Sequence, residues 1–105
     1  MREERIGKLK VLLEQDPGDS FSRYALALEY AGADDSSKAI ALLEDLILRD
    51  QTYVPAYQQL GYLYEKLGRL QEAAAIFKRG MHLAAQQGDH HAQSEMQDAL
   101  DSLDA

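Results

Sequence analysis

A pattern of apolar and small residues that returns after thirty-four positions constrains this chain more than any other feature. Its clearer copy consists of Tyr57, Leu60, Gly61, Tyr64, Ala73 and Phe77. Its weaker copy, thirty-four positions earlier, keeps Leu26, Ala27, Tyr30 and Ala39. Intervals of three and four residues place side chains on one face of a helix, and a period of this length is typical of solenoids built from helix pairs. The pattern predicts an all-α chain of antiparallel helix hairpins.

Size and charge narrow the kinds of partner that such a chain can bind. The chain has 105 residues, with eighteen acidic and eleven basic side chains and a formal charge of −7. This length suits one domain with a modest core. The negative charge opposes binding to DNA, RNA or an anionic membrane surface. We therefore expect no nucleic-acid partner and no membrane association, and a basic or apolar partner fits better.

Two features that the sequence lacks argue against cysteine-based sites and against a secreted or membrane-spanning protein. The chain contains no cysteine, so it has no disulfide framework, thiolate nucleophile or zinc-thiolate site. The first ten residues, MREERIGKLK, carry charges where a signal peptide needs an apolar core. No later segment approaches the roughly eighteen consecutive apolar residues of a membrane-spanning helix. We expect a cytoplasmic protein.

Turn and cap signals divide the chain into about six helices. The first expected helix ends near residue 15. The other five cover residues 21 to 31, 37 to 49, 53 to 67, 71 to 85 and 90 to 103. Cap candidates precede four of them: Asp19 or Ser20, the stretch from Asp34 to Ser36, Thr52, and Asp89. Gly80 lies inside the fifth helix, where glycine costs about 1 kcal/mol relative to alanine. We expect a neighbouring helix to approach closely at that position.

With these residues in place, the chain resembles the tetratricopeptide repeat family, whose pattern is W-x₂-L-G-x₂-Y, then A-x₃-F, then P. Residues 54–87 match well, with Tyr57 in place of the tryptophan and Ala85 in place of the proline. Residues 20–53 match less well, because Leu43 replaces the aromatic residue. Other departures in that copy are Arg23, Leu46 and Gln51.

The resemblance implies a domain organisation. It implies one domain over residues 1–105, folded as a right-handed superhelix of helix hairpins. Its parts are a half-repeat helix at 1–19, full repeats at 20–53 and 54–87, and a capping helix at 88–105. A cap is expected because the last apolar face of a repeat stack would otherwise meet water.

In the family, the first helix of each repeat lines a concave groove that receives a peptide or a helix. The positions that the resemblance places in this partner-binding groove are Phe21, Tyr24, Leu28, Ala31, Gln58, Tyr62 and Glu65. An alternative is that Tyr24 and Leu28 pack against the first helix, as apolar residues at helical spacing commonly do. One subgroup clamps a C-terminal carboxylate with lysine, asparagine and arginine. The corresponding positions here carry other side chains, which does not support that specificity.

Catalytic and metal-binding chemistry finds little support in the sequence. The histidines are His82, His90 and His91, and their spacing fits no known ligand motif. No GxSxG motif or glycine-rich phosphate loop occurs. We expect neither an enzyme nor a cofactor.

These observations predict a non-catalytic scaffold that binds a protein or peptide. The alternative is a structural subunit that forms homo-oligomers. Arg2, Arg5, Lys8 and Lys10 lie near the start, whereas residues 89–105 carry five acidic groups and no Lys or Arg. Opposite charges at the two ends suggest head-to-tail association of the first and sixth helices as one form of that alternative.

Overall fold

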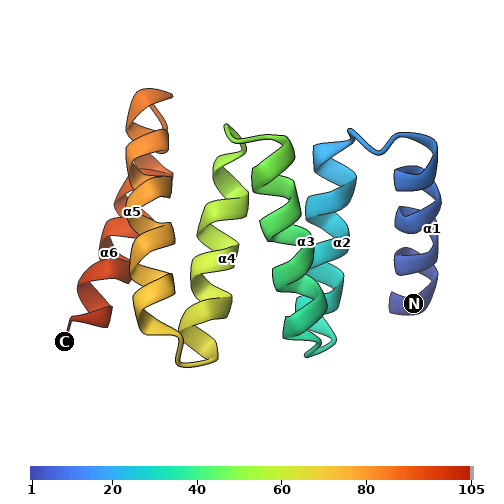
Figure 1. Cartoon of the computed structure of the whole chain (residues 1–105), viewed down its shortest axis with the longest axis horizontal. Helices are drawn as coiled ribbons and strands as arrows, with labels where there is room; N and C mark the ends of the chain where they lie inside the picture. Colours follow the sequence, from blue (N-terminus) through green and yellow to red (C-terminus); the bar gives the residue numbers. More distant parts are fainter. Residues whose placement is uncertain (105) are drawn as a thin grey trace. The chain divides into compact units, whose positions relative to one another are not determined.

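The computed structural model describes residues 1–104, and these residues form six α-helices and no strand (Figure 1). The helices are α1 (Arg2–Gln15), α2 (Ser20–Gly32), α3 (Ser36–Arg49), α4 (Val54–Lys66), α5 (Leu70–Gln86) and α6 (His90–Leu103). The predicted all-α class and the six helices are confirmed.

The chain divides into two compact units, which we describe separately. The first unit, Met1–Gln51, contains α1, α2 and α3, and the second unit begins at Thr52 and contains α4, α5 and α6. The division falls close to the predicted repeat boundary at residues 53 and 54. Among the described helices, we find no apolar segment of the length needed to span a lipid bilayer.

Aspartate caps begin three of the six helices. The carboxylates of Asp19, Asp35 and Asp89 accept hydrogen bonds from backbone N–H groups three residues later, at 3.1, 3.3 and 3.1 Å. Such bonds satisfy donors that have no partner inside the helix. The prediction that Thr52 caps α4 is wrong. The N-cap is Tyr53, without a side-chain cap, and the Thr52 carbonyl oxygen accepts the N–H of Val54 at 3.0 Å.

Three helix-to-helix turns share one backbone geometry. After α2, α4 and α5, the chain passes through a positive φ at Asp34 (62°), Gly68 (75°) and Gly88 (72°). In each turn the following N–H returns to a carbonyl five residues earlier, as in Asp35 N to Tyr30 O at 2.9 Å. This arrangement is a Schellman cap, which usually requires glycine at the left-handed position. Asp34 therefore adopts a conformation that favours glycine.

Leucine packing and one buried arginine hold the α2–α3 hairpin together. Leu43 and Leu46 are fully buried. Arg23 is also buried, and its Nη1 donates a 2.6 Å hydrogen bond to the carbonyl oxygen of Pro17 in the α1–α2 turn. Its Nε lies 3.3 Å from a carboxylate oxygen of Asp45 on α3. One side chain thereby links the turn, α2 and α3.

Helix α1 packs on α2 without burying any residue completely. Its side chains toward α2 are the half-buried Ile6, Leu9 and Leu13. Polar contacts supplement them, because the Arg5 Nε and the Arg2 Nε lie 2.6 and 3.4 Å from the Glu29 carboxylate. Helix α1 is therefore attached by half-buried apolar packing together with exposed ion pairs.

Close approach between helices organises the second unit. A Cβ at Gly61 on α4 would overlap the ring of Phe77 on α5, which is fully buried. A Cβ at Gly80 would lie 2.6 Å from the Met96 sulfur on α6 and 2.8 Å from the Tyr57 Cβ on α4. The predicted close approach at Gly80 is confirmed, and the two glycines let α5 pack tightly against both neighbours.

Candidate partner-binding site

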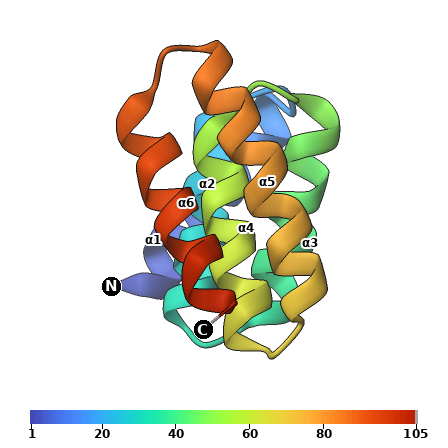
Figure 2. The same cartoon turned by 90° about the vertical axis from the view of Figure 1, so that its left-hand side faces the viewer.

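A groove between α4 and α6 in the second unit contains residues that the sequence places in a binding groove. Figure 2 shows α6 lying beside α4 and α5. The groove holds a cavity of about 370 Å³. Its lining residues are Tyr62 and Glu65 from α4, and Glu95, Asp98, Ala99 and Ser102 from α6. We call this surface the α4–α6 groove.

Tyr62 is held in a fixed orientation beside this groove. Its ring meets the Phe77 ring edge-to-face, with the centroids 5.5 Å apart and the planes at 64°. Its hydroxyl oxygen accepts a 3.0 Å hydrogen bond from the Gln58 amide nitrogen. The side chain nevertheless stays 36% exposed. The hydroxyl proton therefore remains available to a partner, while packing limits the motion of the ring.

The α4–α6 groove is acidic. Glu65, Glu95 and Asp98 contribute three carboxylates, and no lysine or arginine is among the lining residues. Nearby, the Nε2 of His91 lies 3.0 Å from the Glu95 carboxylate. Because like charges are gathered in one concave surface, the groove favours a cationic side chain and disfavours a carboxylate.

The glycine contacts of the fold place the two walls of this groove. Gly61 lets the backbone of α4 approach Phe77, and Tyr62 follows it directly in the chain. Gly80 gives room to Met96, the fully buried residue that anchors α6. Residues that match the repeat pattern therefore build the hairpin, whereas the groove residues lie at positions that the pattern leaves free.

The three predicted groove residues of α4 come together as expected by their register. Gln58 contacts Tyr62, and Tyr62 and Glu65 line the same cavity. The four α2 residues belong to the first unit, where Phe21 is 69% exposed and Leu28 is 39% exposed. Tyr24 and Ala31 are half-buried. The predicted groove residues therefore form two sets, one on α2 and one on α4. Whether a partner binds them stays a prediction.

Sequence reasoning did not assign the α6 wall of the groove. Its charged members are Glu95 and Asp98, which belong to a series of acidic residues at every third position of the last helix. Residues three apart lie on neighbouring positions of one helix face. This spacing marks a polar face of the helix, but it does not say which other helix that face lies beside.

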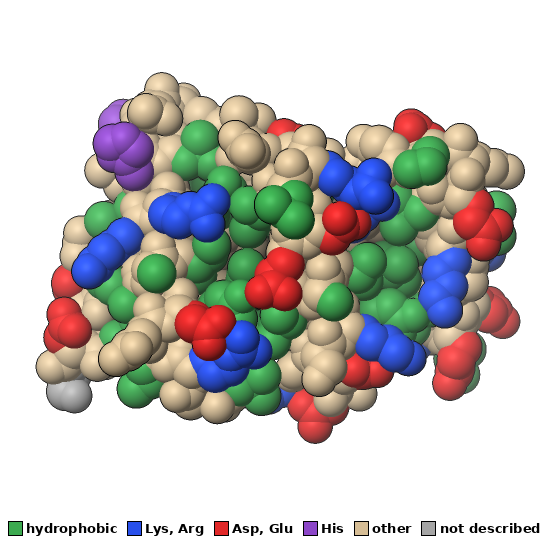
Figure 3. Space-filling view, in the orientation of Figure 1, with side chains coloured by type: hydrophobic (Ala, Val, Ile, Leu, Met, Phe, Trp, Pro, Cys, Tyr) green, Lys and Arg blue, Asp and Glu red, His purple; other side chains and the backbone are tan. Residues whose placement is uncertain are grey.

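The histidines lie at the exposed end of α5 and the start of α6. Figure 3 shows the histidine side chains, coloured purple, grouped at one end of the second unit. Within residues 1–104, no group of three or more His, Asp or Glu side chains is arranged to hold a metal ion. The observed histidine contact is the pair of His91 with Glu95.

Comparison with known proteins gives consistent results. The family model described as "Tetratricopeptide repeat" matches residues 54–87. A solution structure of a tetratricopeptide repeat domain protein from Salinibacter ruber is 42% identical, covering 84% of this chain and 89% of that one, with a TM-score of 0.79. A TPR repeat-containing protein of Pseudomonas aeruginosa is 28% identical over 99 residues, 94% of each chain.

A more distant likeness extends over most of the fold. The TPR2B domain of yeast Sti1, solved in a complex with pHsp70, is 15% identical with a TM-score of 0.88. The match covers 94% of this chain and 79% of that one. Together with the repeat residues, the helix hairpins and the Salinibacter relative, these findings show that the chain belongs to the tetratricopeptide repeat family.

Proposed function

We propose that this chain is a non-catalytic protein-binding scaffold whose α4–α6 groove receives a peptide or helix carrying lysine or arginine. One observation carries the proposal. The groove combines three carboxylates with the hydroxyl groups of Tyr62 and Ser102 on a surface that contains no basic lining residue. A cationic partner side chain would gain both hydrogen bonds and charge complementarity there.

The chemistry of Tyr62 supports a role in recognition. Tyrosine offers a broad apolar face together with a polar tip, and it is enriched among the residues that dominate binding energy. The ring of Tyr62 is already packed on Phe77 and bonded to Gln58. A partner would therefore meet a preorganised side chain, which lowers the entropy lost on binding.

The structural neighbours support a protein partner in general and leave its chemistry open. The yeast Sti1 domain was solved with pHsp70, which is a protein ligand. For this chain we propose a specificity unlike that of the family subgroup that clamps a C-terminal carboxylate, because three carboxylates in the groove would repel such a group. The charge of the partner is therefore the main distinguishing property.

The exposed apolar residues of α2 form a second candidate contact surface. Phe21 and Leu28 are exposed, and Tyr24 and Ala31 lie on the same helix. We propose that they bind apolar side chains of the partner. We also propose the division into a half-repeat, two repeats and a cap as the organisation that presents these surfaces.

The test uses two peptide probes and the ¹⁵N-labelled chain. One probe is a short peptide of arginine and leucine, and the other has glutamate in place of each arginine. We expect the arginine probe to shift amide resonances of α4 and α6, and the glutamate probe to leave them unchanged. Binding of both probes alike, or of neither, would overturn the proposed charge preference.

Matched variants then localise the binding. Glu95→Gln with Asp98→Asn removes two groove charges, and we expect an affinity loss of about tenfold. Asp101→Asn with Asp104→Asn removes the same charge from the last turn of α6 and its C-cap, outside the groove lining. The control should lose less than about twofold because neither carboxylate lines the groove, so neither contacts the bound side chain directly. Equal losses in both pairs would point to general charge attraction and not to the groove.

A further inference from the structure

Helix α1 carries apolar side chains on two opposite sides, and only one side faces α2. Ile6, Leu9 and Leu13 are half-buried on the α2 side. Val11 and Leu12 lie on other sides and are 50% and 46% exposed. An amphipathic surface helix needs a single apolar stripe. A helix with a second apolar side has surface for a second neighbour.

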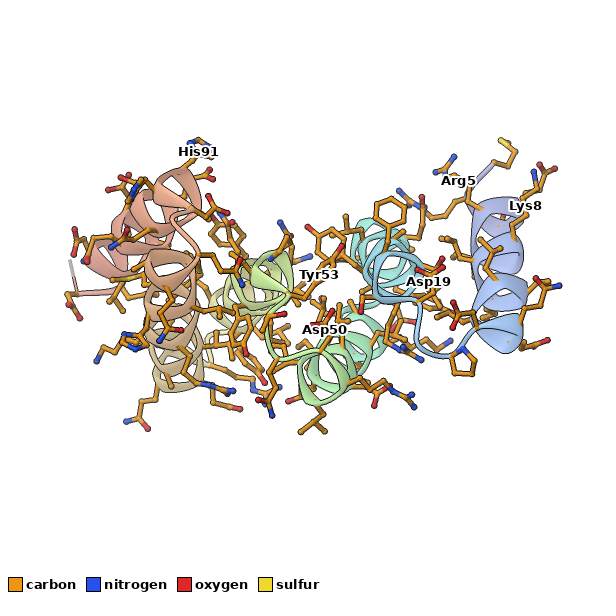
Figure 4. All side chains as sticks on the ribbon, turned by 90° about the horizontal axis from the view of Figure 1, so that it is seen from above. Arg5, Lys8, Asp19, Asp50, Tyr53 and His91 are labelled. Atoms are coloured by element: carbon orange, nitrogen blue, oxygen red, sulfur yellow. The ribbon has the colours of Figure 1, made fainter. Side chains whose placement is uncertain are left out.

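The second side of α1 forms an open, largely apolar groove. Its lining residues are Glu4, Gly7, Lys8, Val11 and Leu12, and we call this surface the outer face of α1. Figure 4 shows the Lys8 side chain directed away from α2. The intervals of three, one, three and one residues place all five positions along one helical stripe.

Gly7 is the central residue of this outer face. Inside a helix, glycine is less favourable than every residue except proline. At Gly61 and Gly80 a Cβ would collide with neighbouring atoms, which explains those glycines. At Gly7 a Cβ would meet nothing within 4 Å in the described chain. Close packing within residues 1–104 therefore does not account for Gly7, whereas a second helix crossing at this position would.

The outer face carries one charge of each sign, so two copies of it can pair with each other. Glu4 and Lys8 have opposite signs and lie one turn apart, on either side of Gly7. If a second copy of α1 crosses in the antiparallel direction near Gly7, Glu4 of each copy lies within side-chain reach of Lys8 of the other. The same arrangement places Val11 of each copy over the N-terminal half of the other helix, and the two helix dipoles oppose each other favourably.

Head-to-tail pairing of α1 with α6 is less well supported by these contacts. Arg2 and Arg5 supplied half of the positive charge behind that hypothesis. Both guanidinium groups bond to Glu29 of α2 in the same chain. The outer face that remains carries one positive and one negative side chain, which matches a second copy of itself better than an acidic helix.

We propose that the outer face of α1 is a self-association surface, and that a second copy of this chain covers it in an antiparallel α1–α1 pair. Because each copy contributes only one helix face, we expect a weak dimer with a dissociation constant on the order of 100 µM. The proposal is independent of the α4–α6 groove.

Sedimentation equilibrium over a range of concentrations tests the pairing. We expect a reversible monomer–dimer equilibrium that Val11→Asp weakens by at least about tenfold. Leu48→Asp is the matched control, because Leu48 is an apolar residue of α3 that is 78% exposed. A monomer at every concentration, or equal weakening by both variants, would overturn the proposal. Circular dichroism verifies that both variants are folded.

Charge reversal keeps the test decisive if Val11→Asp unfolds. Glu4→Lys gives the outer face two positive side chains and should weaken the dimer, and Lys8→Glu should do the same with negative ones. The double variant restores opposite signs across the interface and should recover the wild-type dissociation constant. If the double variant is as weak as the single variants, the antiparallel pair is wrong.

Disulfide trapping distinguishes the two modes of self-association. The natural chain has no cysteine, so Lys8→Cys and Asp98→Cys each introduce a single thiol. We expect rapid cross-linking between chains that carry Lys8→Cys, because position 8 lies near the two-fold axis. A mixture in which the two variants cross-link to each other faster than Lys8→Cys chains do among themselves would support head-to-tail pairing and overturn the proposal.

Discussion

The α2–α3 and α4–α5 hairpins occupy the same register of the repeat, yet they stabilise it with different chemistry. In the second unit, Gly61 makes room for the ring of Phe77. At the equivalent positions, the first unit has Ala27 and Leu43, and both are buried. A larger side chain on one helix therefore accompanies a smaller one on the other. The repeat constrains the combined volume more strongly than either residue alone.

A second pair of equivalent positions shows the same principle for polar contacts. In the first unit, Arg23 on α2 approaches Asp45 on α3 at 3.3 Å. Thirty-four residues later, Tyr57 and Arg79 form a cation–π contact, with the guanidinium carbon 5.4 Å from the ring centroid. An ion pair and a cation–π pair thus solve the same packing problem. In the first unit the cation is on the first helix of the hairpin, and in the second unit it is on the second helix.

The largest expected loss of stability comes from giving the first unit only half of the cation–π pair of the second unit. Asp45→Arg removes the half-exposed carboxylate that both Arg23 and Arg49 contact and adds a third cation beside them. We expect a loss of about 3 kcal/mol in the free energy of unfolding, mainly because the buried Arg23 loses its partner. Adding Arg23→Tyr transfers the pair of the second unit and should recover most of that loss. Urea denaturation of both variants measures the coupling. Additive losses would show that the two positions do not form a transferable pair.

A somewhat smaller effect is expected where the volumes are mismatched. Gly61→Ala forces a methyl group into the Phe77 ring, which should cost about 2 kcal/mol. Combined with Phe77→Leu, it reproduces the pair of the first unit, and the combined loss should be less than the sum of the separate losses. Ala27→Gly is the control and should cost about 1 kcal/mol or less. Strict additivity of Gly61→Ala and Phe77→Leu in thermal or urea unfolding would contradict the volume argument.

Substitutions in the helix-to-helix turns should change the free energy of unfolding by an intermediate amount. Asp34 and Gly68 occupy equivalent positions and have φ values of 62° and 75°. We expect Asp34→Gly to stabilise the first unit by about 0.5 kcal/mol, and Gly68→Asp to destabilise the second by about 1 kcal/mol. Differential scanning calorimetry measures both shifts. Effects of the same sign in the two turns would refute their equivalence.

The smallest expected change in stability comes from removing an exposed ion pair, and this change depends on pH. The hydrogen bond from Arg5 lowers the pKa of Glu29, and the bond from Arg2 lowers it further. The charged form therefore stabilises the folded chain above the ordinary glutamate pKa of about 4.3, and this contribution is lost as pH falls through the lower folded-state pKa. Glu29→Gln should lower the urea midpoint at pH 7.

At low pH the same variant should match the wild type, because Glu29 is then protonated in both the folded and the unfolded state. Glu72→Gln is the control. The hydrogen bond from Arg69 lowers the pKa of Glu72, but Arg69 is only three residues away on the chain. Its effect on unfolding should therefore be smaller. A Glu29→Gln difference that persists below the folded-state pKa would show that charge is not the cause.

The repeat register made most of the fold predictable from sequence. Spacing and turn residues predicted six helices, the close approach at Gly80 and the aspartate caps. The role of Asp34 was less visible, because a left-handed turn position is normally recognised by glycine. The cap on α4 was also misjudged, since the Thr52 backbone rather than its side chain makes the turn bond.

The candidate site was predictable only on one side. Register assigned Tyr62 and Glu65, because the first helix of a repeat is constrained by the pattern on its packed face. It gave no assignment for Glu95 or Asp98, because α6 does not follow the repeat residues. Which face of such a helix contributes to a groove depends on its packing through Met96, and that contact is long-range.

Amide hydrogen exchange by NMR compares the two units most directly. If close packing around Gly61, Phe77 and Gly80 fixes the platform of the α4–α6 groove, α4 and α5 will contain the slowest amides, and added salt will hardly change them. If polar bonds to Glu29 hold α1, its amides will exchange fastest among the helices and faster still in high salt, because salt screens exposed charges. If α1 is as well protected as α4 and does not respond to salt, the claim that the two units are stabilised by different contacts is wrong.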